Sequence, residues 1–257
     1  MSRTERAAGR PGKALAVILG LLGMLVLAGL GTWQVQRLHW KQGLLHTIDA
    51  RMHSAPLPLA EVEREFAATG DVDYLPVTVT GTFLHSGERD FFATWGDDVG
   101  YNIYTPLALR DGRYLLVNRG FVPDTYKDPA RRSEGQLGGV VTVTGLARNP
   151  LAAKPSMMLP DNDPAANIFY WKDRDVMAAT AGLPAGAKIV PFFVDTDKTP
   201  NPGGLPIGGV TIVDLPNNHL QYAFTWYGLA AALAGVLLVW LRRPAVRDEE
   251  QGVQEHP

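Results

Sequence analysis

A histidine followed by two aromatic residues at helical spacing is the most chemically distinctive feature of this 257-residue chain. His219 comes directly after Asn217 and Asn218, a residue type that caps the first turn of helices. Tyr222 and Trp226 follow three and seven residues later, so the three side chains share one face of the predicted helix. The positive end of the helix dipole disfavours imidazolium. The sequence therefore predicts a neutral imidazole, the form that binds iron.

A second aromatic group lies where the N-terminal apolar segment ends. Trp33, Arg37 and Trp40 recur at steps of three or four residues, and Arg37 and Lys41 can pair with propionates. Aromatic rings beside an apolar membrane wall suit a flat macrocycle, which makes His219 a candidate axial ligand of haem. Aromatic residues also gather at membrane interfaces in most spanning proteins, where a histidine usually only hydrogen-bonds. The residues alone leave both interpretations open.

Two long segments without charge must position these groups. No charged residue occurs from Ala14 to Gln36 or from Leu220 to Leu241. About 20 apolar residues are needed to cross roughly 30 Å of hydrocarbon. One charged side chain at mid-membrane costs about 2.5–3.5 kcal/mol, so such segments rarely arise by chance. We predict transmembrane helices at residues 14–33 and 220–241.

Each segment has an alternative interpretation. The first follows a basic prelude, as a cleavable signal peptide would, but it is longer than the usual apolar core of about 7–15 residues and lacks a clear Ala-x-Ala cleavage site. These features favour an uncleaved anchor. The second segment resembles a buried core helix in composition, but its length, Trp240 and the following Arg242 favour a membrane helix. The basic residues of the prelude are Arg3, Arg6, Arg10 and Lys13.

The basic flanks predict the orientation. Short flanks rich in lysine and arginine stay in the cytoplasm, which applies to residues 1–13 and to the tail at 242–257. Residues 34–219 then lie outside, in the periplasm if the chain is bacterial. A mitochondrial location would need a transit peptide, and a prelude containing Glu5 is a poor one. We expect a multi-pass protein of the bacterial inner membrane with both termini cytoplasmic.

The composition excludes several kinds of catalytic and metal site. Without cysteine, the chain has no thiol nucleophile, thiolate zinc site, iron–sulfur cluster or c-type haem attachment. His39, His46 and His53 repeat every seven residues, about 10.5 Å apart along a helix, too far to share one metal ion. The sequence contains no Gly-x-Ser-x-Gly, phosphate-loop or His-Glu-x-x-His motif. We expect neither enzymatic activity nor nucleic-acid binding.

The segment between the membrane helices is predicted to form one β-rich (α+β) domain. The first helix should continue past the membrane until Ser54 and Pro56 end it. The predicted strands are 77–83, 91–93, 101–109, 114–122, 189–195 and 211–214, with short helices at 59–67 and 173–181. Val-Thr-Val-Thr-Gly occurs at Val77–Gly81 and again at Val141–Gly145. An internal duplication would explain this, but poorly matching neighbours favour two strands in similar half-buried environments.

Three separated motifs make the chain resemble the surfeit locus protein 1 family of cytochrome oxidase assembly factors. The motifs are Leu30–Lys41, Val117–Pro123 and Pro216–Trp226, in the expected order and with the expected two-helix topology. Gly31 and Trp33 match the family signature, whereas Phe121 stands where many members carry tryptophan.

The resemblance implies a role in building haem–copper terminal oxidases. It suggests that the chain binds haem a, assists its insertion into the catalytic subunit and contacts other assembly factors. In the family, the position of His219 is the proposed haem ligand. We expect the other binding residues to be Tyr222, Trp226, Trp33 and Arg37.

A cofactor-free scaffold that binds oxidase subunits is the alternative interpretation. Asn118, Arg119 and the aromatic residues at the membrane would then be contact residues. A membrane-anchored enzyme is a more distant third, because no catalytic group is visible.

Overall fold

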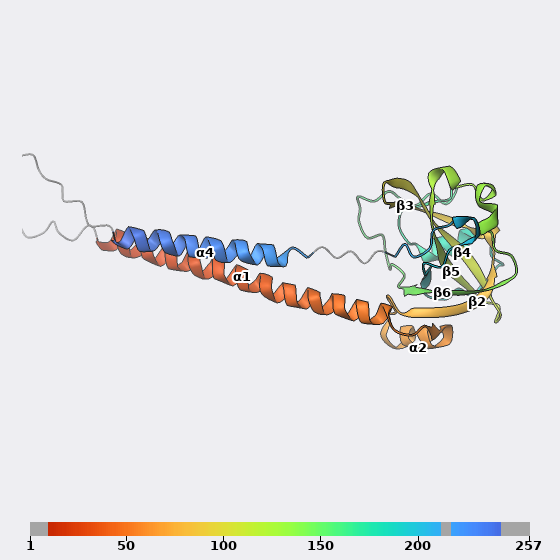
Figure 1. Ribbon diagram of the computed structural model, residues 1–257, viewed down its shortest axis with the longest axis horizontal. Coiled ribbons are helices and arrows are strands. Elements are labelled where there is room, and N and C mark those ends of the chain that lie inside the picture. Colours follow the sequence, from red (N-terminus) through yellow and green to blue (C-terminus); the bar gives the residue numbers. More distant parts are fainter. Residues whose placement is uncertain (1–9, 212–216, 243–257) are drawn as a thin grey trace, which may run out of the picture. The chain divides into compact units, whose positions relative to one another are not determined.

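The chain folds into a helical unit and a β-rich unit, shown in the computed structural model of Figure 1. The structure describes residues 10–211 and 217–242. The helical unit comprises Met1–Leu45 and Leu215–Pro257, and the β-rich unit comprises His46–Asp214. Each unit has its own internal packing, so we describe them separately.

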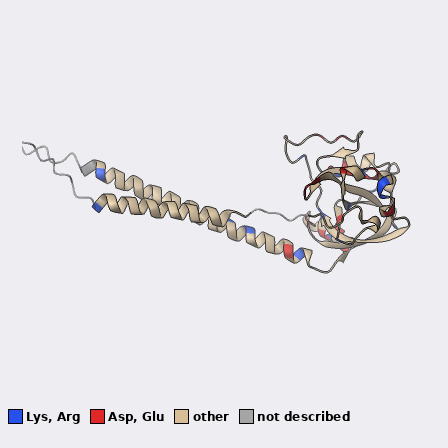
Figure 2. Ribbon diagram, turned by 45° about the horizontal axis from the view of Figure 1, so that its top comes forward, with Lys and Arg blue, Asp and Glu red and all other residues tan. Residues whose placement is uncertain are grey.

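Two long apolar helices make up the described part of the helical unit. They are α1 (Arg10–Met52) and α4 (His219–Arg242), and both are long and apolar enough to cross a membrane. Figure 2 shows that charged residues occur only at the C-terminal end of α4 and in the two end regions of α1. Of the most apolar windows, only 6% of the residues in α1 and 0% in α4 are buried within the protein. A core helix of a soluble protein would be mostly buried, whereas a membrane helix presents its apolar surface to lipid.

The extent of α1 confirms that the first helix continues past its apolar segment. It ends at Met52, just before Ser54 and Pro56, where proline can no longer donate a helical hydrogen bond. The membrane boundaries at 14–33 and 220–241 stay predictions.

Small residues let α1 and α4 pack closely and antiparallel, side by side in both Figure 1 and Figure 2. A Cβ atom added to Gly20 would overlap the side chain of Leu237, and one added to Gly31 would lie 2.8 Å from Cε1 of Tyr227. Thr32 Oγ1 and the Tyr227 hydroxyl are 3.0 Å apart, within hydrogen-bonding distance. In lipid, no hydrophobic force drives two apolar helices together. Close packing at glycine is one way in which membrane helices associate instead.

The β-rich unit is built on one sheet that closes on itself. Among the described residues, eight strands pair in the order β1-β2-β6-β8-β5-β4-β3-β7, and β2 also pairs with β4. The ring β2-β6-β8-β5-β4 is therefore a closed barrel, which removes the free edges of its strands. The strands are β1 (Leu57–Pro58), β2 (Pro76–Phe83), β3 (Arg89–Trp95), β4 (Asp98–Leu109), β5 (Tyr114–Pro123), β6 (Val140–Arg148), β7 (Ile168–Phe169) and β8 (Phe193–Thr196).

Short helices complete the β-rich unit. The helix α2 (Leu59–Thr69) covers the barrel with Val62 and Phe66, and Gly70 ends it with a positive φ of 72°. The helix α3 (Arg174–Thr180) starts at Asp173, whose side chain accepts a hydrogen bond from the Val176 amide. Both confirm the predicted helices. The 3₁₀ helices are η1 (His85–Gly87), η2 (Asp124–Tyr126), η3 (Pro129–Gly135) and η4 (Pro202–Gly204).

Most predicted strands are confirmed, but the prediction for residues 189–195 is wrong in its extent. The strand β8 begins only at Phe193, and Ile189 makes an isolated bridge to Tyr114. Pro191 lies between them and has no amide hydrogen to donate to a ladder. Of the predicted strand at 211–214, Thr211 is not in a strand, and 212–214 lie outside the described residues.

The two copies of Val-Thr-Val-Thr-Gly pair with each other. The strands β2 and β6 are antiparallel, and Val79 lies opposite Val143 at the centre of the two copies. On the opposite face, the hydroxyls of Thr80 and Thr142 are 3.0 Å apart. Both copies therefore direct valines toward the barrel interior and threonines toward its outer face.

The final glycine of each copy is required by a neighbouring strand. A Cβ atom at Gly81 would meet the carbonyl oxygen of Ala108 in β4, and one at Gly145 would meet that of Asp195 in β8. The repeat thus reflects equivalent surroundings of two barrel strands, as the sequence favoured.

A buried ionic cluster joins the barrel to the loops beside it. Glu88 accepts a hydrogen bond of 2.6 Å from Arg132 and one of 3.2 Å from Arg119, and all three side chains are buried. Burial by itself would raise the pKa of Glu88. Hydrogen bonds from His85 and Arg132 and the guanidinium charges outweigh burial and lower this pKa to about 2.

Replacing this carboxylate should destabilise the domain strongly. We expect Glu88→Gln to lower the free energy of unfolding at pH 7 by about 3–5 kcal/mol, because it leaves two buried guanidinium groups without their counter-ion. The folded pKa of about 2 is below the ordinary value of 4.5, so this contribution is present above pH 4.5 and is lost as pH falls toward 2.

Urea unfolding of the full chain in detergent micelles, at several pH values, measures both effects. The matched control is Glu65→Gln on the exposed face of α2, which should change stability by less than about 0.5 kcal/mol. Equal effects of the two substitutions would contradict the prediction.

Candidate functional site

His219 is the first residue of α4, and its imidazole contacts α1. The Tyr222 amide donates to the Asn218 carbonyl at 3.1 Å, so the helix starts where the asparagine pair predicted. Nδ1 of His219 lies 2.7 Å from Oε1 of Gln34. Gln34 is only 9% exposed, and within the described residues Nε2 of His219 makes no hydrogen bond. The histidine is therefore held through one ring nitrogen while the other has no protein partner in that part of the chain.

The aromatic residues predicted for the site lie around this contact but mostly face outward. Trp33 is 51% exposed and Tyr222 is 52% exposed, whereas Trp226 is half-buried. The guanidinium carbon of Arg37 lies 4.3 Å from the centroid of the Trp40 ring. Arg37 is thus placed by a cation–π contact on its own helix.

Helical geometry places these side chains on one side of the α1–α4 pair. Successive residues turn by about 100°, so with Gln34 facing α4, Trp33 and Arg37 both project to the same side. On α4, which runs in the opposite direction, Tyr222 and Trp226 project to that same side when His219 faces α1. The structure therefore groups the predicted residues on one surface of the helical unit.

The contact between Tyr227 and Gly31 supports this assignment of sides. Tyr227 projects to the opposite side of the pair, where its ring covers Gly31 and its hydroxyl reaches Thr32. One side is thus filled by Tyr227, while the other carries exposed rings and a guanidinium group.

Sequence reasoning missed Gln34 and Tyr227. Gln34 is an uncharged polar residue in an apolar helix, and it continues the spacing of three or four residues from Gly20 and Gly23 through Gly31. That spacing marks the face of α1 that meets α4. The signal was present, but nothing in the sequence says which residue of α4 lies opposite.

The central motif Val117–Pro123 has a structural role. Asn118 Nδ2 donates to Asp195 at 3.1 Å, and Arg119 pairs with Glu88. The scaffold interpretation would make Asn118 and Arg119 contact residues, but both side chains are buried and bind buried carboxylates, so neither is exposed to a partner. Gly120 follows with a φ of 120°, where a Cβ atom would meet the carbonyl of Ile207.

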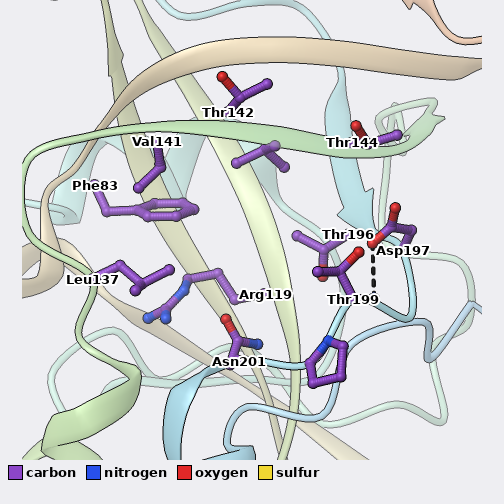
Figure 3. Close-up of a pocket in the computed structure, with 12 residues that line it drawn as sticks. Phe83, Arg119, Leu137, Val141, Thr142, Thr144, Thr196, Asp197, Thr199 and Asn201 are labelled. Atoms are coloured by element: carbon purple, nitrogen blue, oxygen red, sulfur yellow. Dashed lines mark hydrogen bonds between the residues drawn. The ribbon is translucent and has the colours of Figure 1, made fainter.

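A pocket of about 160 Å³ lies beside β6 in the β-rich unit, but it carries no obvious chemistry (Figure 3). Thr142, Thr144 and Thr199 line it, and the guanidinium of Arg119 points toward Leu137 beneath the Phe83 ring. Within residues 10–211 and 217–242, no group of three or more histidines and carboxylates is arranged to hold a metal ion. The candidate site therefore stays at the helix pair.

Comparison with known proteins gives the family. The model of the SURF1 family matches residues 21–231, which include both Gln34 and His219. The chain belongs to the SURF1 family. This confirms the resemblance read from the motifs and identifies the chain as a membrane protein of a family of cytochrome oxidase assembly factors.

Individual relatives cover most of the chain. Surfeit locus protein 1 of Rattus norvegicus is 38% identical over 84% of this chain and 71% of its own length. The human protein of the same name is 36% identical over 84% of this chain and 73% of its own length. A SURF1-like protein of Monosiga brevicollis is 35% identical over 85% and 84%.

A side chain at Gly31 should loosen the helix pair next to the site. We expect Gly31→Val to lower the stability of the helical unit by about 1–3 kcal/mol, because the new methyl groups overlap the Tyr227 ring. Titrating the micelle-bound full chain with a denaturing detergent, followed by circular dichroism, measures this change.

The matched control is Gly29→Val on the same helix, where a Cβ atom meets nothing within 4 Å. Because both substitutions introduce the same β-branched residue into α1, their difference isolates the packing effect. A control that is as destabilised as Gly31→Val would refute the packing argument.

Proposed function

We propose that this SURF1 family member is a non-catalytic haem chaperone that binds haem a and assists its insertion into the catalytic subunit of a haem–copper terminal oxidase. The observation that carries the proposal is the half-buried His219, held by Gln34 through Nδ1 with Nε2 left unpartnered within the described residues. A neutral imidazole nitrogen of this kind is a common ligand of haem iron. Haem is the cargo here, so binding must be reversible.

The surroundings of His219 suit this cargo. One side of the helix pair carries aromatic surface from Tyr222, Trp226 and Trp33. A macrocycle on that side can replace its contacts with lipid by contacts with these rings. Arg37 supplies a positive charge at the same side for a propionate. In the proposal, His219 binds the iron, the aromatic residues cover the ring and Arg37 orients it.

A cofactor-free scaffold is the second candidate, and one feature of the β-rich unit favours it. Met157 and Met158 are 98% and 95% exposed. Leu151, in the same loop, is also exposed. Exposed apolar side chains in a loop are typical of protein contacts, and methionine adapts to varied partners. Such a surface would bind oxidase subunits or other assembly factors.

Absorption spectroscopy separates the two candidates. The full chain, purified from cells that make haem a, should carry close to one haem per chain, and His219→Ala should remove most of it. His46→Ala, an exposed histidine on α1, is the matched control and should keep its haem. Haem-free protein that still co-purifies with oxidase subunits would favour the scaffold, and haem unaffected by His219→Ala would eliminate the ligand assignment.

The same proposal includes a location and an orientation. We propose that the chain lies in a bacterial inner membrane with the β-rich unit in the periplasm and both termini in the cytoplasm. Arg242 and Arg243 directly after the second apolar segment support this orientation.

Reporter fusions test the orientation. Green fluorescent protein fused after Pro257 should fluoresce, and alkaline phosphatase fused there should be inactive, because one folds only in the cytoplasm and the other only in the periplasm. The control is alkaline phosphatase inserted at Gly138 in an exposed loop of the β-rich unit, which should be active. The reverse pattern would invert the topology.

A further inference from the structure

We infer that Gln34 is a positioning residue, whose side-chain carbonyl fixes His219 in the tautomer that presents an unprotonated Nε2 to the haem iron. The inference rests on the proposed function and deepens it by assigning the residue that prepares the ligand. It concerns the helical unit alone, where α1 and α4 carry both side chains.

The contact fixes the position of the proton. An amide oxygen only accepts hydrogen bonds, so Oε1 of Gln34 at 2.7 Å requires a hydrogen on Nδ1 of His219. A neutral imidazole carries one ring hydrogen, so its Nε2 then has a free lone pair.

Burial makes this hydrogen bond hard to replace. Gln34 is 9% exposed, and an amide without a partner in apolar surroundings costs about 1–3 kcal/mol. About one helical turn away, Tyr227 packs on Gly31 and reaches Thr32, which holds the two helices at a fixed separation. The imidazole therefore has one favoured ring orientation before any haem arrives.

A neutral amide suits a ligand that must later release its cargo. Metal-binding histidines commonly donate the hydrogen on their other ring nitrogen to a carboxylate or carbonyl, and this partner raises the basicity of the ligand. An amide oxygen polarises the ring less than a carboxylate does. Gln34 thus orients His219 without strengthening the iron bond as much as a glutamate would.

The tautomer can be measured without haem. In the full chain in micelles, with ¹⁵N-labelled histidine, we expect the His219 ring to show a protonated Nδ1 and an unprotonated Nε2. Gln34→Leu should change this pattern, and Gln36→Leu should not, because Gln36 is an exposed glutamine on the same helix. A protonated Nε2 in the unmodified chain, or no change in Gln34→Leu, would overturn the inference.

Haem titration of the same variants tests the consequence. Gln34→Leu should weaken haem binding by about 10–100-fold, as loss of such partners does in metal sites. Gln34→Glu should keep or tighten binding and slow haem dissociation, and Gln36→Leu should match the unmodified chain. Equal haem affinity in Gln34→Leu and the unmodified chain would also overturn the inference.

The two measurements distinguish failure of the inference from failure of the proposed function. An unmodified chain with the expected tautomer and no haem binding would refute the chaperone function and the ligand role together. Haem binding that depends on His219 but not on Gln34 would refute the inference alone.

Discussion

The hydrogen bond between His219 and Gln34 is the interaction on which the candidate site depends. It joins residues 185 positions apart, across two helices that pack closely where glycines leave room for the facing side chains. In lipid, no hydrophobic force presses two apolar helices together, so close packing and a few polar contacts must do it. The same contacts that associate the helices therefore also orient the histidine.

The sequence predicted the elements well because their signals are local. Charge-free length identified both apolar helices, and the alternation of Val77–Phe83 identified β2. Predictions from local signals can also fail locally. Pro191 shortened the strand predicted at 189–195, because a residue without an amide hydrogen interrupts a ladder whatever the apolarity of its neighbours.

What the sequence could not supply is the pairing between distant segments. The closure of the barrel by β2 and β4 is one such case, and the burial of Arg119 against Glu88 is another. A charged residue in a motif suggests a surface role because burying a charge is costly. Only the fold shows that Glu88, which directly precedes β3, supplies the counter-charge of Arg119. In the same way, only the fold shows that Gln34 lies opposite His219.

The two polar contacts differ in charge because their surroundings differ. Inside the β-rich unit, Glu88 pairs with two guanidinium groups. Fixed hydrogen bonds within the protein replace the hydration that these charges lose on burial. At the helix pair, a carboxylate in place of Gln34 would need such compensation from a largely apolar helix, which offers little. A neutral amide avoids this desolvation cost and still directs the Nδ1 hydrogen. The apolar surroundings thus favour glutamine as the partner of the histidine, and in the proposed function this gives a haem ligand that holds its cargo less tightly than a histidine–carboxylate pair would.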